Sequence, residues 1–272
     1  MIMIIWLASY PRSGNTWLRA FLSNYLYRKE EETLKNLELI DLFPSEKYFS
    51  ELINKKEISE NKKNIFKYYV LAQDKLNLNN KINIIKTHCF AGKVEGNDFS
   101  NSENTAGFIY IVRDPRSVAV SNSHHEEVDI EKSVEQILNP NRFSNVQDIY
   151  MEFRSSWKNH YLSWAQKKWN CLFVRYEDLH SDPFTNFKKI LIFIKKFMPI
   201  EINEEKIKEV IEISSFKKLA KIENKLGFKE NVSKENFFRK GLIDEWKKAL
   251  PKNLITKIEK NFEKEMKELN YL

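Results

Sequence analysis

The chain has 272 residues, of which 42% are hydrophobic, and this is enough to fill the core of one large domain. Its formal net charge of +7 favours an anionic ligand, a nucleic acid or an anionic membrane, but lysines spread over solvated helix faces give the same total. No stretch is rich in Gly, Pro or Ser, and the two cysteines lack the spacing of a zinc site or redox motif, which argues against linkers and a disulfide framework. We therefore expect a single domain over residues 1–272, with reduced thiols, in the cytoplasm.

The first eight residues form a continuous apolar run, which predicts a buried strand. This run is too short to span a bilayer and has no basic segment ahead of it, so we expect neither a signal peptide nor a membrane anchor. Apolar residues at helical spacing follow from Trp17 to Leu26. The sequence therefore predicts a strand, a turn over residues 9–16, and a helix.

Three further apolar runs, residues 82–86, 107–112 and 171–176, alternate with helical patterns. This order predicts an α/β fold with a central parallel sheet flanked by helices on both faces. Ligands of such sheets bind at the carboxyl ends of the strands, which is where residues 9–16 lie.

Three helices are expected in the second half of the chain. A stripe of apolar residues predicts one helix over residues 149–164, and Asp182 and Pro183 are typical of the N-cap and first turn of another. The last helix begins near Pro251. The apolar stripes consist of Ile149, Phe153, Trp157, Tyr161 and Trp164 in the first helix and of Leu254, Ile258, Phe262 and Leu269 in the last.

The segment SYPRSGNTWLR, residues 9–19, has the composition of an anion site. A helix N-terminus offers free backbone N–H groups and a partial positive charge. Gly14 permits close approach of the backbone, Arg12 adds a forked charged donor, and the segment also holds hydroxyls. By itself, such a segment would more often be an ordinary N-cap turn with an exposed arginine. It lacks the GxxxxGK[ST] pattern, which disfavours an ATPase or kinase.

Basic residues recur at three further strand ends or loops. These are RDPRSVAVS (residues 113–121), RYEDLHSDP (175–183) and FFRKGLIDEWK (237–247). Together with the first turn, they suggest a ligand that carries phosphates at two separate places.

These segments resemble the soluble cytosolic sulfotransferases that use 3′-phosphoadenosine 5′-phosphosulfate (PAPS). YPRSGNTW is similar to the family's 5′-phosphosulfate loop, a P-loop-like turn, and RDPRSVAVS is similar to its 3′-phosphate strand and helix. FFRKGLIDEWK is similar to its RKGxxGDWK closing motif, and KTH, residues 86–88, lies where the family has its catalytic lysine and histidine. The four motifs occur in the family's order and span nearly the whole chain.

The resemblance implies three groups of nucleotide-binding residues, with charged forks for the phosphates and π faces for the base. They are Arg12, Ser13, Gly14, Asn15 and Thr16 for the 5′-phosphosulfate, with Trp17 on adenine; Arg113, Ser121, Arg239, Lys240 and Gly241 for the 3′-phosphate; and Tyr176, Ser214 and Phe216 for the adenine pocket. The product would be 3′,5′-diphosphoadenosine (PAP), and no metal is expected.

The chain departs from the family pattern at three places. Arg12 stands where many animal members have lysine, and in this it is similar to bacterial members. Asp244 and Glu245 replace the usual Gly-Asp of the closing motif, which changes backbone freedom and charge near the nucleotide. The segment after Trp246 lacks the family's short dimerisation motif, so the resemblance implies no dimer and the oligomeric state stays open.

Sulfuryl transfer needs no covalent intermediate, so positioning and charge neutralisation are expected to do most of the work, as in phosphoryl transfer. His88 is the candidate general base, because imidazole can accept a hydroxyl proton at neutral pH. A lone histidine after a strand is usually a hydrogen-bonded loop residue, but the KTH motif favours the catalytic role. Lys86 would neutralise charge on the transferring group or on the leaving oxygen, and Arg12 would lie beside the bridging oxygen.

Three other features receive no ligand. His124 and His125 lie among acidic residues, and we expect a solvated loop near the acceptor rather than a metal site. Cys89 is expected to be a packed small residue. Residues 227–236 are polar and are a hypothetical flap that orders when the nucleotide binds.

The leading hypothesis is an enzyme that transfers sulfate from PAPS to a hydroxyl, or less readily an amine, on a small molecule or glycoconjugate. One alternative is a P-loop kinase or nucleotide hydrolase that uses ATP and Mg²⁺. Another is a catalytically silent nucleotide-binding or nucleic-acid-binding protein. No aromatic and basic strand platform of the RNA-binding type is present, so we expect no nucleic-acid partner, and no stable membrane insertion is expected.

Overall fold

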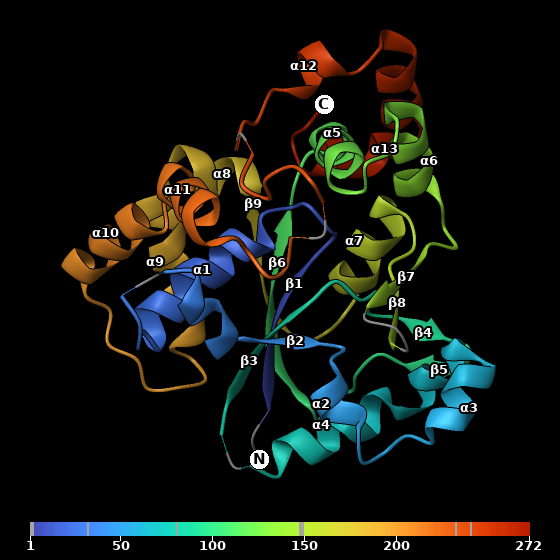
Figure 1. Ribbon diagram of the computed structural model, residues 1–272, viewed down its shortest axis with the longest axis vertical. Helices are drawn as coiled ribbons and strands as arrows, with labels where there is room; N and C mark the ends of the chain where they lie inside the picture. The colour runs from blue at the N-terminus through green and yellow to red at the C-terminus, as the bar shows by residue number, and fades with distance from the viewer. Residues whose placement is uncertain (1–2, 32, 80, 147–149, 232, 240) are drawn as a thin grey trace.

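A five-stranded sheet lies at the centre of the computed structural model, which describes residues 3–31, 33–79, 81–146, 150–231, 233–239 and 241–272. The strands β1 (Ile4–Ser9), β2 (Asp41–Phe43), β3 (Asn83–Thr87), β6 (Thr105–Val112) and β9 (Asn170–Arg175) lie in the order β2-β3-β1-β6-β9. All neighbouring strands are parallel. The fold is therefore the predicted α/β fold, and β1 runs through its middle (Figure 1).

The continuous apolar run at the N-terminus reflects burial of β1 on both faces. Ile4, Trp6 and Ala8 belong to one hydrophobic core, whereas Ile5 and Leu7 belong to another on the opposite face. Since successive side chains of a strand point to opposite faces, a strand with two covered faces shows no apolar and polar alternation.

Helices cover both faces of the sheet (Figure 1). The core of Ile5 and Leu7 is closed by α1 (Asn15–Leu26), α9 (Pro183–Ile194) and α10 (Glu204–Ile213), and the core of Trp6 by α5 (Pro115–His125), α7 (Trp157–Ala165) and α13 (Lys252–Glu268). The remaining elements are the helices α2 (Glu46–Phe49), α3 (Lys55–Glu60), α4 (Tyr69–Asn77), α6 (Ile130–Leu138), α8 (Tyr176–Ser181), α11 (Phe216–Leu226) and α12 (Trp246–Ala249), the 3₁₀ turns η1 (Lys35–Leu39) and η2 (Lys62–Tyr68), and the strand pairs β4 (Lys93–Val94) with β5 (Asn97–Asp98) and β7 (Phe143–Val146) with β8 (Tyr150–Phe153).

The predicted strands and most predicted helices are confirmed. The last predicted strand residue, Tyr176, instead begins α8, because the chain turns at the end of β9. Asp182 caps α9 by accepting a hydrogen bond from the backbone N–H of Thr185, and Pro183 follows it in the first turn. Pro251 is the N-cap of α13.

The predicted helix over residues 149–164 is wrong in its first half. Phe153 ends β8, which pairs with β7, and α7 begins only at Trp157 after the capping residue Ser156. Ser155 has a φ of 59°, which no helix tolerates. Ile149 lies outside the described residues.

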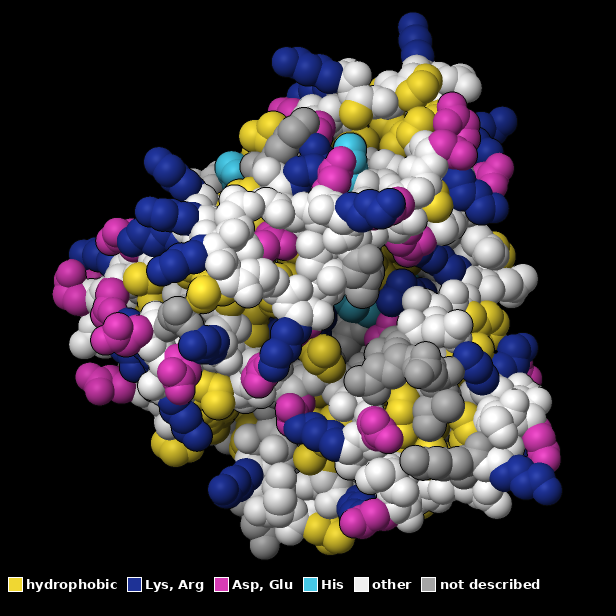
Figure 2. All heavy atoms as spheres, viewed as in Figure 1, with side chains coloured by type: hydrophobic (Ala, Val, Ile, Leu, Met, Phe, Trp, Pro, Cys, Tyr) yellow, Lys and Arg dark blue, Asp and Glu magenta, His cyan; other side chains and the backbone are white. Residues whose placement is uncertain are grey.

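The positive charge forms no single patch on the face shown in Figure 2, where Lys and Arg side chains are scattered among Asp and Glu. Many of these side chains are paired, as Lys188 is with Glu204 at 2.6 Å. This pattern agrees with lysines on solvated helix faces as a source of the net charge. Among the described residues, no helix is long and apolar enough to cross a membrane.

Candidate functional site

The turn between β1 and α1 has an unusual backbone. Arg12 and Gly14 have φ angles of 67° and 95°, so both lie in the left-handed region. Such a turn curls backbone N–H groups toward a common point, which suits an anion. Gly14 also lies against Tyr176, because a Cβ atom at position 14 would be only 2.4 Å from Cδ2 of that ring.

Gly14→Ala is expected to destabilise the protein more than Gly96→Ala. Both glycines have positive φ, and alanine costs about 1–2 kcal/mol there. A Cβ at position 96 meets no atom of the described residues within 4 Å, whereas one at position 14 displaces Tyr176 at a further cost of about 1–3 kcal/mol. Urea unfolding of both variants measures the difference in the free energy of unfolding. Equal losses of this free energy would show that the Tyr176 ring moves aside at no cost.

Two arginines from distant segments, Arg113 and Arg239, lie near Arg12 of this turn. The backbone oxygen of Arg12 accepts a hydrogen bond of 2.9 Å from the Arg113 guanidinium. The Arg12 guanidinium donates to the Ser121 hydroxyl at 3.1 Å. Burial and the positive charges of Arg113 and Arg239 lower the pKa of Arg12 to about 10. Like charges held this close favour an anion between them.

Unpartnered donors belong to this turn, to the first residues of α1 and to the residue after β6. The Ser13 hydroxyl, the Trp17 indole N–H and Nε of Arg113 are buried without a hydrogen-bond partner among the described residues. Buried donors normally have partners, so these three are suited to receive a ligand with acceptor oxygens.

The closing motif, residues 237–247, is held by the end of β6 and the start of α5. Nη2 of Arg113 donates to the Leu242 oxygen at 3.0 Å, and Ser117 donates to the Ile243 oxygen at 2.7 Å. Within the motif, Arg239 forms a two-pronged ion pair with Glu245, with contacts of 2.9 and 2.5 Å. The substituted residue Glu245 thus provides the anion for Arg239.

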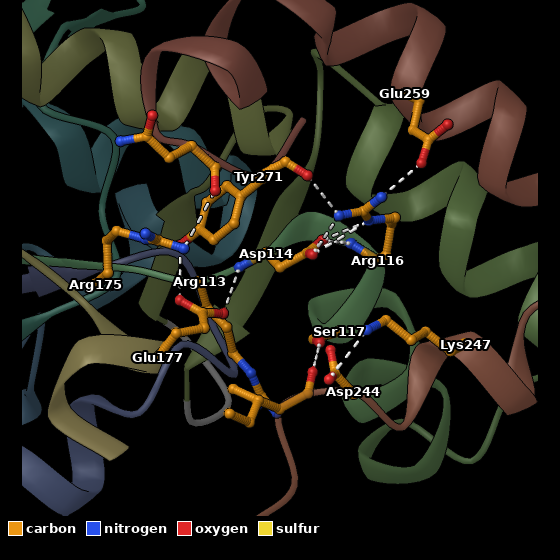
Figure 3. Close-up of polar contacts among 12 residues, drawn as sticks. Arg113, Asp114, Arg116, Ser117, Arg175, Glu177, Asp244, Lys247, Glu259 and Tyr271 are labelled. Atoms are coloured by element: carbon orange, nitrogen blue, oxygen red, sulfur yellow. Dashed lines mark hydrogen bonds and ion pairs between the residues drawn. The ribbon is translucent and has the colours of Figure 1, made fainter. Parts of the chain in front are cut away.

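Figure 3 shows how the C-terminal residues support this region. Arg116 bonds Asp114, Glu259 and the backbone oxygen of Tyr271, and it stacks on Trp246 with its Cζ 3.8 Å from the ring centroid. Tyr271 donates its hydroxyl to Glu177, which also accepts from the backbone N–H of Asp114. The segment after β6 is therefore fixed from several sides.

His88 has a defined tautomer at the end of β3. Its Nδ1 lies 2.8 Å from the Ser9 backbone oxygen, which can only accept, so Nδ1 carries the proton and Nε2 keeps a free lone pair. Burial and the charges of Lys86 and Arg154 hold the pKa of His88 well below its usual value. At neutral pH this side chain is therefore an uncharged base.

His160 holds the backbone of His88 in place. It contacts the His88 oxygen through Nε2 at 3.0 Å and the Tyr110 hydroxyl through Nδ1 at 2.9 Å. Burial lowers the pKa of His160 to about 3. His160 is thus a neutral support for the loop, a role the sequence did not indicate.

Lys86 lies on β3 beside His88 and is almost completely buried. Burial and the nearby Arg19 lower its pKa to about 8, against the opposing effect of Glu230. The Glu230 carboxylate lies 3.6 Å from the Lys86 ammonium and also bonds the Arg19 guanidinium. Glu230 belongs to residues 227–236, which were predicted to form a flap.

A cavity of about 400 Å³ opens where the four motifs meet. All site residues predicted from the sequence line it except Ser13, Ser214 and Lys240. Ser13 is buried, and Lys240 lies outside the described residues. Ser214 does not line the cavity, because its hydroxyl is buried and donates to the Val210 oxygen at 2.6 Å, whereas the next residue, Ser215, does line it.

The cavity also contains side chains that the sequence did not single out. Arg154, which follows β8, is a charged group near His88, and Glu230 is a charged group near Lys86. Neither belongs to a motif, and Arg154 falls in the segment that was taken for a helix. Only the pattern of an isolated charge after an apolar strand could have indicated Arg154.

The predicted acidic and histidine-rich loop is wrong in its structure. His124 and His125 are the last residues of α5, and both line the cavity. His124 contacts Glu235 at 3.3 Å. Among the described residues, no group of three or more His, Cys, Asp or Glu side chains could hold a metal ion. Cys89 is buried, as expected.

Comparison with known proteins agrees with this arrangement. The chain is 30% identical over 273 residues to flavonol 3-sulfotransferase of Flaveria bidentis, with 94% of this chain and 79% of the relative covered. It is 23% identical to the amine sulfotransferase of Oryctolagus cuniculus, over 97% of this chain and 81% of the relative.

Solved structures share the fold. Retinol dehydratase in complex with androsterone and PAP matches with a TM-score of 0.65 and 21% identity, over 97% of this chain and 80% of that one. Mouse sulfotransferase SULT7A1 with PAP matches with a TM-score of 0.60 and 20% identity, over 97% and 84%. The sulfotransferase domain family matches residues 4–270. Because that match covers nearly the whole chain, the protein belongs to the sulfotransferase family of enzymes.

Proposed function

We propose that the enzyme transfers a sulfuryl group from PAPS to a hydroxyl group of a small molecule or glycoconjugate, with His88 as the general base. The observation that carries this proposal is the tautomer of His88, whose Nε2 is an uncharged acceptor in a cavity that Lys86 and Arg12 also line. Residues 1–272 act as one domain in this proposal, which is supported by the two hydrophobic cores that lie against the same sheet.

The nucleotide end of the cavity suits a ligand with two phosphates. The turn at residues 10–16 offers backbone N–H groups and the Ser13 hydroxyl to the 5′-phosphosulfate, and Arg12 adds charge. Arg113, Ser121 and Arg239 bind the 3′-phosphate. The rings of Trp17, Tyr176 and Phe216 offer their faces to adenine; the first two are in contact, with centroids 6.0 Å apart.

The chemical step needs one proton acceptor and several positive charges. His88 Nε2 takes the proton of the acceptor hydroxyl, whose oxygen forms a bond to sulfur as the bond from sulfur to the phosphate oxygen breaks. Lys86 neutralises charge on the transferring group, and Arg12 neutralises charge on the leaving oxygen. The phosphate left on PAP carries the electron pair of the broken bond.

PAP is expected to stabilise the enzyme against heat without any metal ion. A ligand that binds only the folded state stabilises it by about 2.7 kcal/mol at one hundred times its dissociation constant. A thermal-shift titration with PAP, beside ATP with and without Mg²⁺, measures this effect. Stabilisation by ATP with Mg²⁺ but not by PAP would favour a kinase or nucleotide hydrolase, and no response to either would contradict a nucleotide-dependent enzyme.

A further inference from the structure

Glu230 is held in the cavity by a buried arginine. Arg19, on α1, has only 1% of its side chain exposed, and its guanidinium bonds one Glu230 carboxylate oxygen. The other carboxylate oxygen lies 3.6 Å from Nζ of Lys86. Burial opposes ionisation of Glu230, but Lys86 and Arg19 together lower its pKa below the usual value, so the carboxylate is charged at neutral pH.

The anchor of Glu230 is built from distant parts of the chain. Glu230 is separated from Arg19 by 211 residues and from Lys86 by more than one hundred, so this contact depends on the complete fold. The neighbouring Phe228, Phe237 and Phe238 form an aromatic cluster, with centroids 5.1 to 5.6 Å apart, that packs against α1 and α11. The segment therefore has an apolar base that fixes Glu230 over Lys86.

The charges around Lys86 come from four elements. Arg19 on α1 is a like charge that disfavours the ammonium form, while Glu230 and Glu152 on β8 favour it. His88, which follows the end of β3, is neutral at neutral pH because its pKa is lowered. Glu152 also forms an ion pair with Arg154, whose Nη2 lies 3.0 Å from the Glu152 carboxylate. Glu230 is thus the carboxylate that contacts Lys86 directly.

We propose that Glu230 is a positioning residue for sulfuryl transfer, which keeps the Lys86 side chain charged and directed into the cavity. This inference rests on the proposed function, in which Lys86 neutralises the transferring group. A neutral lysine amine could still accept or donate a hydrogen bond, but it would not stabilise the negative charge that develops on the sulfuryl oxygens. Glu230 thereby extends the pH range in which the enzyme works.

The charge of Lys86 can be measured without any substrate. Acetic anhydride reacts with neutral amines, so the rate of Lys86 acetylation against pH, followed by mass spectrometry of its peptide, gives the midpoint of deprotonation. In Glu230→Gln this midpoint is expected to fall by about one pH unit from a starting value of about 8. Glu230→Asp keeps an anion for Arg19 but draws it back by one methylene, so a smaller fall in the same direction is expected.

Glu235→Gln is the matched control. Glu235 lies on the same segment and also lines the cavity, but it contacts His124 instead of Lys86. The Lys86 midpoint in this variant is expected to equal that of the wild type. Thermal unfolding shows which variants are folded, and if Glu230→Gln is not, Glu230→Asp decides the test. An unchanged midpoint in the folded Glu230 variants, or an equal fall in Glu235→Gln, would overturn the proposal.

The role in transfer is tested by the pH profile of kcat/KM for PAPS, which reports the titrating groups of the free enzyme, the same form that is labelled. The folded pKa of Lys86 is lowered, so its charge is present below about pH 8 and is lost as the pH rises through that value. The alkaline limb of the profile is expected to move to lower pH in Glu230→Gln by the same amount as the labelling midpoint. A shifted midpoint with an unshifted alkaline limb would overturn the role of Glu230 in transfer. Absence of turnover with PAPS in the wild type would instead contradict the proposed function itself, whatever the labelling shows.

Discussion

His88→Ala is expected to lower kcat by about 10²- to 10⁴-fold while leaving the affinity for PAP close to that of the wild type. The Nδ1 atom of His88 is committed to the Ser9 oxygen, so Nε2 is the atom that can accept a proton, and alanine removes it. Because the pKa of His88 is held well below its usual value, the wild type is expected to keep its base uncharged and to stay active below pH 6.5.

Single-turnover and steady-state rates with PAPS, together with PAP binding by calorimetry, measure the two effects separately. His124→Ala is a suitable control, since His124 lies at the edge of the same cavity and contacts Glu235. It is expected to keep kcat within a few-fold. Full activity in His88→Ala would refute the base assignment, and lost PAP affinity would show that His88 acts on the nucleotide instead.

Arg113→Ala is expected to weaken PAP binding by about 10- to 100-fold, because hydrogen bonds to charged groups contribute about 1.5–3 kcal/mol. Its guanidinium already holds the Arg12 and Leu242 oxygens, and its Cζ lies 4.3 Å from the Tyr176 ring centroid. Its Nε has no partner within the described part of the chain and remains for a phosphate oxygen. The variant therefore loses charge and also the link between the first turn and the closing motif.

Arg175→Ala separates a specific contact from a general loss of positive charge. Arg175 ends β9 and stacks on Tyr271, with its Cζ 4.7 Å from the ring centroid, outside the cavity lining. Calorimetric titration with PAP is expected to show near wild-type affinity for this variant. Equal weakening in both variants would contradict the 3′-phosphate role of Arg113.

The sequence predicted the central strands well because their signal does not depend on long-range contacts. A strand buried on both faces needs apolar residues throughout, as in β1 and β6. The predicted helix over residues 149–164 failed because residues four apart lie on one face of a strand as well as of a helix. Phe153 and Trp157 have the spacing of a helix, although β8 ends at Phe153 and α7 begins at Trp157.

The candidate site was predicted where sequence motifs define it. Local rules placed the first turn and the KTH segment at the carboxyl edge of a parallel sheet, and the cavity is lined by both. Ser214 and Ser215 show the limit of this reasoning, since a shift of one residue at the end of α10 decides which of them faces the cavity. Glu230 could not be predicted, because only the folded chain brings it to Arg19 and Lys86.

The ion pair between Arg239 and Glu245 makes the closing motif its own source of counterions. When a nucleotide phosphate binds Arg239, the phosphate replaces the Glu245 carboxylate as the partner of that arginine. No dissolved anion then needs to leave Arg239. Affinity for the nucleotide is then less sensitive to ionic strength than the number of arginines near the cavity suggests. Glu245, a carboxylate like the family's aspartate at this position, would thus help to make the enzyme tolerant of salt.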